Sequence, residues 1–371
     1  MRIGLDAHVI GRRKTGNERY IVGLGNALAA RQDLEVTAFL DAGRAWPGAD
    51  GVDPVPLVRT LRSRGRLGRL LLDLPTQARH ARSQLLHVQY VAPLVAGVPT
   101  VVAVHDVSFE DRPELFSTPT RLRLQATIRA STRRAAAVIA LSDFTRERLL
   151  HHYDLDPRRV FVAHAAVDSR FSRAGSGTGV DLGSLGLPGS FVLHVGDLVP
   201  RKNVPRLVAA MAALRRDGIG DVGLVLAGQD GRDTTAVEAA IASATAAGDP
   251  GWVRRLGYVD DATLLALYRA ATVVAYPSLY EGFGLPALEA LAAGSIVVTS
   301  STTALPEVVG DAAVLVDPED TTALAAGLGR AIADEALRAR LGVAGPARAA
   351  AFSWAGCAAA TVIAYRHALR R

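Results

Sequence analysis

The sequence predicts an α/β protein built from two Rossmann-like domains, each with a parallel β-sheet. Short apolar runs alternate along the chain with longer amphipathic stretches, which is typical of strands and helices that follow one another. Several runs are nearly unbroken sequences of Val, Ile, Leu and Ala, as expected for strands covered on both faces of a parallel sheet. A Gly- and Ser-rich segment divides the pattern into two similar halves, and 371 residues are enough for two cores.

Each half has its own set of expected strands. In the first half they cover residues 1–5, 35–40, 85–88, 100–104, 137–140 and 160–163. In the second half they cover residues 191–195, 222–227, 253–256, 273–275, 296–299 and 313–316. The amphipathic stretches between them predict helices, for example at 121–134, 145–151, 204–215 and 262–269.

The segment SRAGSGTGVDLGSLGLPGS has no apolar periodicity and predicts a linker. We therefore expect an N-terminal domain at 1–172, a linker at 173–190 and a C-terminal domain at 191–352. In open parallel sheets, ligands bind at the carboxyl ends of the strands. The expected ligand site is therefore a cleft in which the two domains face each other.

The composition favours a soluble, cytoplasmic protein. Cys357 is the only cysteine, so no internal disulfide can form. At the start of the chain, Asp6 and His8 interrupt the apolar run and the cations follow it, which is the reverse of a signal peptide. No stretch approaches the roughly 18 unbroken apolar residues that a membrane-spanning helix needs.

The net charge of +6 is concentrated in the first half of the chain. Residues 1–175 hold 26 Lys and Arg against 17 Asp and Glu, whereas the remainder is mildly acidic. An anionic partner would explain this, either nucleic acid, an anionic membrane surface or a lipid diphosphate. A general preference for Arg in a GC-rich genome explains it equally well. The stretch VRTLRSRGRLGRLLL at 58–72 indicates a basic amphipathic helix, either a solvated surface helix or a peripheral membrane contact.

The stretch PSLYEGFGLPALEALAAG at 277–294 is the most informative part of the chain. It follows the apolar strand at 273–275, so it lies at the carboxyl end of a strand. Pro286 suits the first position of a helix, and Gly294 suits the position just past its end. A short helix is therefore expected from about Pro286 to Ala293.

The turn before this helix is suited to bind an anion. Gly282 and Gly284 allow a tight turn and a close approach of the backbone to a ligand. The amides of Phe283, Gly284 and Leu285 stand at the helix N-terminus, where N–H groups lack partners within the helix and the dipole is positive.

Two carboxylates, Glu281 and Glu289, flank this turn. A carboxylate accepts two hydrogen bonds at once, which suits the vicinal hydroxyls of a ribose. Glu289, about one turn into the helix, would then hold a ribose, and Glu281 would reach hydroxyls of a transferred sugar. The alternatives are a solvated helix face for Glu289 and an ordinary turn position for Glu281. The combination of strand, glycine turn, proline start and two acids favours the functional interpretation.

A second candidate element is HVGDLVPRKN at 194–203, directly after the first strand of the second half. Arg201 and Lys202 are adjacent cations in a turn before a helix, and they would reach a diphosphate opposite the amides of 283–285. Together these groups could neutralise a departing nucleoside diphosphate without a metal. No Cys and His cluster has the spacing of metal ligands, so no metal ligand set is expected. The alternative is a solvated pair of cations at a helix start.

The first half offers a weaker signal. His105 and Asp106 end the expected strand at 100–104, which points them toward the ligand cleft; a core histidine is the alternative for His105. The stretch GRRKTGNERY at 11–20 predicts a Gly-containing loop after the first strand. Such a loop either closes over a phosphate or is a simple connection.

Nearly the whole chain resembles the retaining glycosyltransferases of family 4, which have the GT-B fold, and in particular their mannosyltransferase-like branch. The Glu281 and Glu289 pair corresponds to the E-x7-E motif of that family. The segments that carry the rest of the resemblance are GNERY, HDVSFEDRPELF, ALSDFTRERL, GDLVPRKN, GYVDDATLLALY, ALPEVVGDAAVLVDPED and FSW.

The resemblance implies a role for each matched residue. Glu289 would bind the donor ribose, Glu281 the donor sugar, and Arg201 and Lys202 the diphosphate, helped by the amides of Phe283, Gly284 and Leu285. Gly16 would lie in the acceptor-side loop near the phosphate, and His105 near the reacting face of the sugar. The backbone around Tyr258 and Val259 would meet the base. The C-terminal helix, residues 353–371, would cross back onto the first domain.

The resemblance also implies an enzyme that transfers a hexose without a metal or other cofactor. Its partners would be a nucleotide-sugar donor and an acceptor that is a glycan, a small molecule, or an anionic or lipid-linked compound, and no nucleic acid. The donor expected first is GDP-mannose, and the alternative is a UDP- or dTDP-sugar. We expect the protein in the cytoplasm, either free or bound peripherally to the inner face of the membrane through its basic N-terminal domain.

Three departures from the family pattern are visible. Ala166 stands where a glycine is usual, Ile296 replaces a usual proline, and Asp197 replaces a cation that some members carry. The last departure weakens the case for a third phosphate-binding cation. Two other function classes stay open: a nucleotide-sugar epimerase of the same shape, and a binding protein without catalytic activity.

Overall fold

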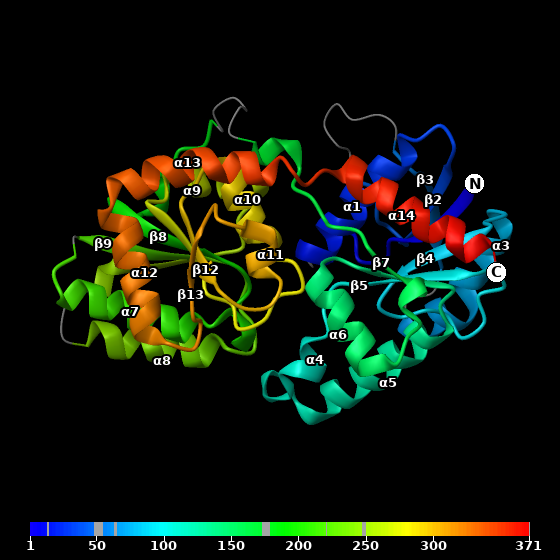
Figure 1. The fold of residues 1–371 in the computed structure, drawn as a ribbon, viewed down its shortest axis with the longest axis horizontal. Helices are drawn as coiled ribbons and strands as arrows, with labels where there is room; N and C mark the ends of the chain where they lie inside the picture. The colour runs from blue at the N-terminus through cyan, green and yellow to red at the C-terminus, as the bar shows by residue number, and fades with distance from the viewer. Residues whose placement is uncertain are drawn as a thin grey trace. The chain divides into compact units, whose positions relative to one another are not determined.

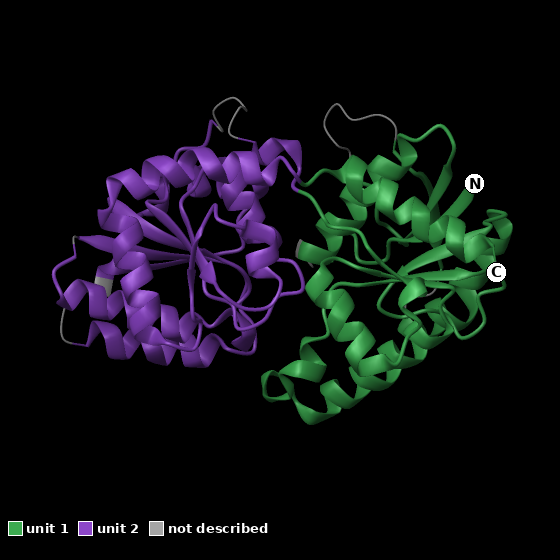
Figure 2. Cartoon of the chain, in the orientation of Figure 1, with its two compact units in different colours: residues 1–166, 352–371 green, residues 167–351 purple. Residues whose placement is uncertain are grey.

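The computed structural model describes residues 1–12, 15–47, 55–62, 65–172, 179–219, 221–246 and 250–370. The chain divides into two compact units (Figure 2). Unit 1 comprises Met1–Ala166 together with Phe352–Arg371, and unit 2 comprises Val167–Ala351. Both units have the α/β architecture with parallel sheets that the sequence predicts.

Figure 1 shows the ribbon of the two sheets and of the helices that cover them. Unit 1 has a parallel sheet of seven described strands in the order β3-β2-β1-β4-β5-β6-β7. The strands are β1 (Arg2–Asp6), β2 (Glu35–Asp41), β3 (Leu57–Leu61), β4 (Leu85–Gln89), β5 (Thr100–Val104), β6 (Ala137–Ala140) and β7 (Val160–Val162). The helices are α1 (Thr15–Ala29), α2 (Arg66–Gly68), α3 (Leu74–His80), α4 (Ser108–Asp111), α5 (Thr118–Arg134), α6 (Asp143–Tyr153) and α14 (Trp354–Leu369). All residues of β4, β5 and β6 are buried. This explains the apolar runs of β5 and β6, whereas β4 also buries the polar residues His87 and Gln89.

Unit 2 has a parallel sheet of six described strands in the order β10-β9-β8-β11-β12-β13. The strands are β8 (Ser190–Val195), β9 (Val222–Ala227), β10 (Val253–Gly257), β11 (Val273–Tyr276), β12 (Val297–Ser300) and β13 (Val314–Val316). The helices are α7 (Val204–Arg216), α8 (Thr234–Thr245), α9 (Asp261–Ala270), α10 (Leu285–Ala293), α11 (Leu305–Val309), α12 (Thr321–Ala333) and α13 (Glu335–Ala349). In this sheet the strand order reverses between β8 and β11, and ligands bind at such a switch point.

The strand predictions agree with the structure except at one edge of the first sheet. Residues 58–72 were expected to form one amphipathic helix, but Leu57–Leu61 form the edge strand β3, and among the described residues of this stretch the helical part begins at Arg66. The helical prediction failed because β3 exposes all of its residues except Leu61 and so lacks the apolar run of a buried strand.

The boundary between the units lies earlier in the chain than expected. Unit 2 starts at Val167, so residues 167–172 and the part of the expected linker at 179–190 belong to it. Residues 173–178 of the expected linker lie outside the described residues. The C-terminal segment from Phe352 belongs to unit 1, where α14 packs against α1 and Tyr365 donates or accepts a 2.8 Å hydrogen bond with His87 Nδ1.

The stretch Glu335–Leu369 is long and apolar enough, by composition, to cross a membrane. The structure divides this stretch into α13 and α14, and each helix buries one face. The buried face of α14 includes Cys357, Val362 and Tyr365, which are part of the core of unit 1. The apolar character of α14 is therefore used for packing within that unit.

Candidate functional site

The loops after β8 and β11 of unit 2 are tied together at the switch point of the sheet. Leu279 N donates a 2.7 Å hydrogen bond to the carbonyl of Arg201. Asn203 Nδ2 donates to the carbonyls of Pro277 at 3.1 Å and Pro318 at 2.7 Å. Asn203 has a φ of 60°, a left-handed conformation that asparagine tolerates better than most residues. These bonds fix the turn that carries the two adjacent cations.

Arg201 and Lys202 both bind Glu281. Lys202 Nζ lies 2.7 Å from Glu281 Oε1, and Arg201 Nη1 lies 2.9 Å from Glu281 Oε2. The hydroxyl of Tyr276, the last residue of β11, donates to the same Oε1 at 2.9 Å and also contacts Lys202 Nζ. Lys202 and Glu281 are buried, whereas the side chain of Arg201 is 32% exposed. Arg201 is thus the more accessible of the two cations.

The protonation states follow from this geometry. Burial would raise the pKa of the Glu281 carboxyl, but the charges of Arg201 and Lys202 outweigh it and lower that pKa to about 2. Burial lowers the pKa of Lys202 to about 8, against the attraction of Glu281. Burial, followed by the nearby charge of Lys202, lowers the pKa of His194 to about 4. At neutral pH the site therefore holds an ionised Glu281 between two cations, beside a neutral histidine.

Two glycines shape this site. Gly196 has a φ of +147°, and a Cβ there would lie 3.2 Å from Lys202 Cε, so the lysine chain passes close over this backbone. Gly284 has a φ of +102° and precedes α10; a Cβ there would lie 2.6 Å from Leu305 Cδ2 and 4.0 Å from Tyr276 Cε1. The N-terminus of α10 thus lies close to the tyrosine that holds Lys202.

Glu289 is buried inside unit 2 rather than on a solvated helix face. It lies on α10, and its Oε2 accepts a 3.1 Å hydrogen bond from the hydroxyl of Tyr268, which belongs to α9. The alternative of a solvated helix face for Glu289 is therefore wrong. Burial of a carboxylate costs free energy unless the group has hydrogen-bond partners, and the hydroxyl of Tyr268 is one such partner of Glu289.

Tyr258 and Val259 follow β10, at the carboxyl edge of the same sheet. Tyr258 is half exposed, and Val259 is partly buried. The next residue, Asp260, caps α9 by accepting a 2.8 Å hydrogen bond from Thr263 N. The assignment of this backbone to base recognition stays a prediction.

In unit 1, His105 follows β5 and its ring packs between two tyrosines. The ring centroid lies 4.7 Å from that of Tyr20 in an edge-on arrangement and 5.2 Å from that of Tyr90 in a stacked one. Burial lowers the pKa of His105 to about 3, so the imidazole is neutral at pH 7. Its Nε2 is buried with no hydrogen-bond partner in the described part of the chain. Asp106 accepts hydrogen bonds from Ser108 N and Oγ at 3.0 and 2.6 Å, so it organises the start of α4.

Gly16 was expected in a loop, and it lies instead in the first turn of α1. The reason is that α1 begins at Thr15, earlier than the Gly-containing sequence suggests. Gly16 is exposed, and a Cβ there would meet no atom of the described residues within 4 Å, so these residues leave room for a ligand beside its backbone. Residues 13 and 14 of the expected loop lie outside the described residues.

Two residues of this site were missed by the sequence analysis. Tyr276 holds both Lys202 and Glu281, and Asn203 holds the turn. Each had a signal: a tyrosine ends an otherwise aliphatic strand, and an asparagine stands directly before the proline-containing first turn of α7.

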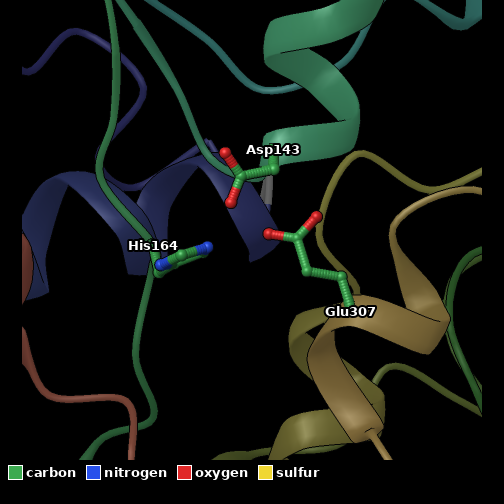
Figure 3. Close-up of side chains that lie close together, drawn as sticks. All are labelled: Asp143, His164 and Glu307. Atoms are coloured by element: carbon green, nitrogen blue, oxygen red, sulfur yellow. The ribbon is translucent and has the colours of Figure 1, made fainter.

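Three further side chains that are able to bind metal ions are drawn in Figure 3. Asp143 is the first residue of α6 and His164 follows β7, both in unit 1, whereas Glu307 lies on α11 of unit 2. They belong to separate units, and the expectation that no metal is needed stays a prediction.

The arrangement in unit 2 is suited to bind an organic diphosphate. Two cations and a helix N-terminus attract its negative charge, and the neighbouring carboxylates offer acceptors for hydroxyl groups. Glu281 uses both of its oxygens for the cations, and a carboxylate has about four acceptor positions, so acceptor capacity remains for a sugar hydroxyl.

Both units match known protein families. Residues 15–171 match the family described as Glycosyltransferase Family 4, and residues 186–348 match the family described as Glycosyl transferases group 1. O-antigen chain mannosyltransferase B of Escherichia coli is 30% identical over 375 residues, a match that covers 95% of this chain and 96% of that protein.

Solved structures agree with this result. Sucrose-phosphate synthase of Thermosynechococcus elongatus has a TM-score of 0.78 and 25% identity, with 99% of this chain and 98% of that chain covered. Anabaena HepE in complex with UDP and glucose has a TM-score of 0.77 and 21% identity, with 99% of each chain covered. The chain therefore belongs to glycosyltransferase family 4 and is a sugar-transferring enzyme with the GT-B fold.

Proposed function

We propose that this enzyme is a retaining mannosyltransferase that takes mannose from GDP-mannose and transfers it to a glycan, lipid-linked or small-molecule acceptor. The observation that carries this proposal is the 30% identity to an O-antigen chain mannosyltransferase across almost the full length of both proteins. A match that covers 95% of the chain includes most of both units.

In this proposal, unit 2 binds the donor. Arg201 and Lys202 bind the diphosphate together with the amides of Phe283, Gly284 and Leu285. The ion pair between Lys202 and Glu281 supports this role because it holds the cation in place before any ligand arrives. Electrostatic groups that are oriented in advance stabilise the charge that develops on a leaving group.

The remaining roles concern the sugar and the nucleoside. Glu289 binds the ribose, and Glu281 binds hydroxyls of the mannose. The backbone at Tyr258 and Val259 meets the base. In unit 1, the neutral ring of His105 lies near the reacting sugar and donates or accepts a hydrogen bond without adding charge, and Gly16 lies on the acceptor side.

We further propose that the reaction needs no divalent metal and takes place in the cytoplasm or at the inner face of its membrane. The paired cations and the helix N-terminus supply the positive charge that a metal would otherwise provide. The single, buried Cys357 suits a reducing compartment. Turnover that is abolished by EDTA and restored by Mg²⁺ or Mn²⁺ would contradict the first of these proposals.

The experiment that tests the donor and the reaction is incubation of the purified protein with GDP-mannose, UDP-glucose and dTDP-glucose, with chromatographic detection of the nucleoside diphosphate. Release of GDP from GDP-mannose, and an α-configured product by NMR with a mannoside acceptor, is expected. Release of UDP or dTDP alone would show that the donor is a UDP- or dTDP-sugar instead of GDP-mannose. A β-configured product would contradict the retaining stereochemistry. Isomerised nucleotide sugar without acceptor would indicate an epimerase.

A further inference from the structure

A helical segment of unit 1 exposes large apolar side chains. Leu67, Leu71 and Leu72 are 72%, 48% and 70% exposed. They lie on the continuous helical segment Arg66–His80, whose opposite side buries Leu70 and Leu74. A folded domain that covers its own core has no structural reason to place three leucines together in water.

A π-helical turn at Arg69–Asp73 produces this arrangement. A π-turn contains one residue more than a regular turn, so both Leu71 and Leu72 face outward about one turn after Leu67. The inward side is fixed by polar contacts: Arg69 pairs with the buried Asp6, and Asp73 accepts a hydrogen bond from Arg62 N. Because these contacts hold the helix in one orientation, the leucines cannot turn into the core.

The same segment is strongly basic. Between residues 55 and 82, Asp73 is the only acidic residue, and it is buried. Arg59 of β3 and Arg66 of α2 are exposed. The pKa of Arg66 is lowered, first by partial burial and then by the charges of Arg123 and Arg69, which shows that cations gather here.

Helix α5 extends this surface. Leu74 of the segment and Ile128 of α5 belong to one core cluster, so the two helices cover the same side of the sheet. Leu122 of α5 is 54% exposed and stands beside the exposed Arg123. The sequence of α5 contains no acidic residue.

We propose that the leucine–arginine face, defined by Arg59, Arg66, Leu67, Leu71, Leu72 and Arg123, docks unit 1 onto an anionic lipid bilayer. The leucines enter the boundary between headgroups and acyl chains, and the arginines lie against the lipid phosphates. The inference deepens the proposed function, since a lipid-linked acceptor lies in such a bilayer. The role of this contact in bringing the enzyme to its acceptor rests on the proposed function, whereas the contact itself is argued from the exposed leucines and arginines.

The combination of residues distinguishes a bilayer from other occupants. A nucleic acid would satisfy the arginines, but its phosphates give exposed leucines no apolar partner. A second copy of the chain, paired through the same face by two-fold symmetry, would bring like charges together. An anionic bilayer satisfies both kinds of side chain at once.

The test is sedimentation of the full-length protein with vesicles of phosphatidylcholine alone and of phosphatidylcholine with 30% phosphatidylglycerol. Three double variants are compared with the wild type: Leu67→Ser with Leu72→Ser, Arg66→Ala with Arg123→Ala, and a control. The control is Val343→Ser with Arg340→Ala on α13 of unit 2, where Val343 is 72% exposed, like Leu67. Thermal unfolding and the response to GDP check that each variant is folded.

We expect binding to the anionic vesicles that weakens with salt. The leucine variant should bind about tenfold more weakly, and the arginine variant about 25-fold more weakly, at about fivefold per cation. The control should bind like the wild type. Equal binding to both vesicle types, or a leucine variant that binds like the wild type, would overturn the proposal.

Two other results would also overturn it. One is that the protein binds a DNA or RNA duplex but no vesicles, and that the leucine variant binds the duplex equally well. The other is a wild-type dimer, seen by analytical ultracentrifugation, that the leucine substitutions dissociate. If the protein binds vesicles but binds no nucleotide sugar, the proposed function is refuted and the inference of membrane docking is still supported.

Discussion

Lys202 and Glu281 stand 79 residues apart in the chain and form a buried ion pair, with 2.7 Å between Nζ and Oε1. The pair joins the loops after two neighbouring strands, β8 and β11, at the switch point of the sheet. Tyr276 bonds to both partners. The cation that is proposed to meet the donor diphosphate is therefore held in position by the carboxylate that is proposed to meet the donor sugar.

Replacing either cation with alanine should weaken donor binding, but only the replacement of Lys202 should strongly lower the free energy of unfolding. Lys202→Ala and Arg201→Ala should each reduce the binding free energy of GDP by about 1.5–3 kcal/mol. Lys202→Ala should also lower the free energy of unfolding by about 3–5 kcal/mol, because it leaves a buried carboxylate with one cation. Calorimetric titration with GDP and urea unfolding measure the two effects. Equal unfolding free energies for both variants would contradict the buried pair.

The affinity for GDP should fall as the pH rises above 8. Because the pKa of Lys202 in the ligand-free protein is about 8, a growing fraction of the lysine must take up a proton before it binds an anion. The expected loss approaches tenfold per pH unit. Lys202→Arg should remove this dependence, because an arginine stays charged. Titrations with GDP between pH 6.5 and 9.5 compare the two proteins, and identical pH profiles would exclude Lys202 as the titrating group.

Glu281 should contribute stability that is lost in acid. Its pKa is lowered from 4.5 to about 2, so the folded protein binds fewer protons than the unfolded chain between these values. The contribution of about 3 kcal/mol is complete above pH 4.5 and disappears as the pH falls toward 2. Urea unfolding of wild type and Glu281→Gln from pH 7 to pH 3 should show curves that converge in acid. Curves that stay parallel would mean that Glu281 is not ionised against the cations.

Glu289→Ala should weaken binding of GDP by about 1.5–3 kcal/mol and leave the binding of inorganic pyrophosphate nearly unchanged. The reason is that the proposed partner of Glu289 is the ribose, which pyrophosphate lacks. Tyr268→Phe is the matched control, since it removes the hydroxyl that bonds to Glu289 and keeps the carboxylate. Parallel losses for GDP and pyrophosphate in Glu289→Ala would assign Glu289 a structural role alone.

Gly284→Ala should damage the donor site through its backbone. An alanine at a φ of +102° is strained, and its Cβ would lie 2.6 Å from Leu305 Cδ2, so the N-terminus of α10 must shift. Gly43→Ala is the control, because Gly43 also has a positive φ, of +76°, but its Cβ would meet nothing within 4 Å. Both variants should lose about 1–3 kcal/mol of stability, and only Gly284→Ala should lose affinity for GDP.

The fold was predictable because most of its strands, such as β5, β6, β9 and β12, are fully buried and therefore mainly apolar. The edge strand β3 escaped prediction for the opposite reason, since Leu57, Val58 and Arg59 are all exposed. No periodicity in sequence distinguishes such a strand from an irregular basic segment. The helix start at Thr15 was missed because a glycine at position 16 indicates a loop, whereas α1 includes this glycine in its first turn.

The residues of the donor site were predictable, but their connections were not. Arg201, Lys202 and Glu281 were identified from local patterns, yet only the folded sheet brings positions 79 residues apart into one ion pair. Tyr276 was left between the expected strand at 273–275 and the stretch at 277–294, and its hydroxyl has a role only because the loops after β8 and β11 meet there. Burial of Glu289 against Tyr268 depends likewise on the packing of α9 and α10.

The central claim is that unit 2 binds a guanosine diphosphate sugar through Arg201, Lys202 and Glu289. The most direct measurement is the shift in thermal unfolding temperature of the full-length protein with GDP, GDP-mannose, UDP, UDP-glucose and dTDP, since a ligand stabilises the folded state by mass action. The account predicts stabilisation by GDP and GDP-mannose that is lost in Lys202→Ala. Stabilisation by UDP or dTDP but not by GDP would contradict the guanosine donor, and no shift with any nucleotide would contradict the site itself.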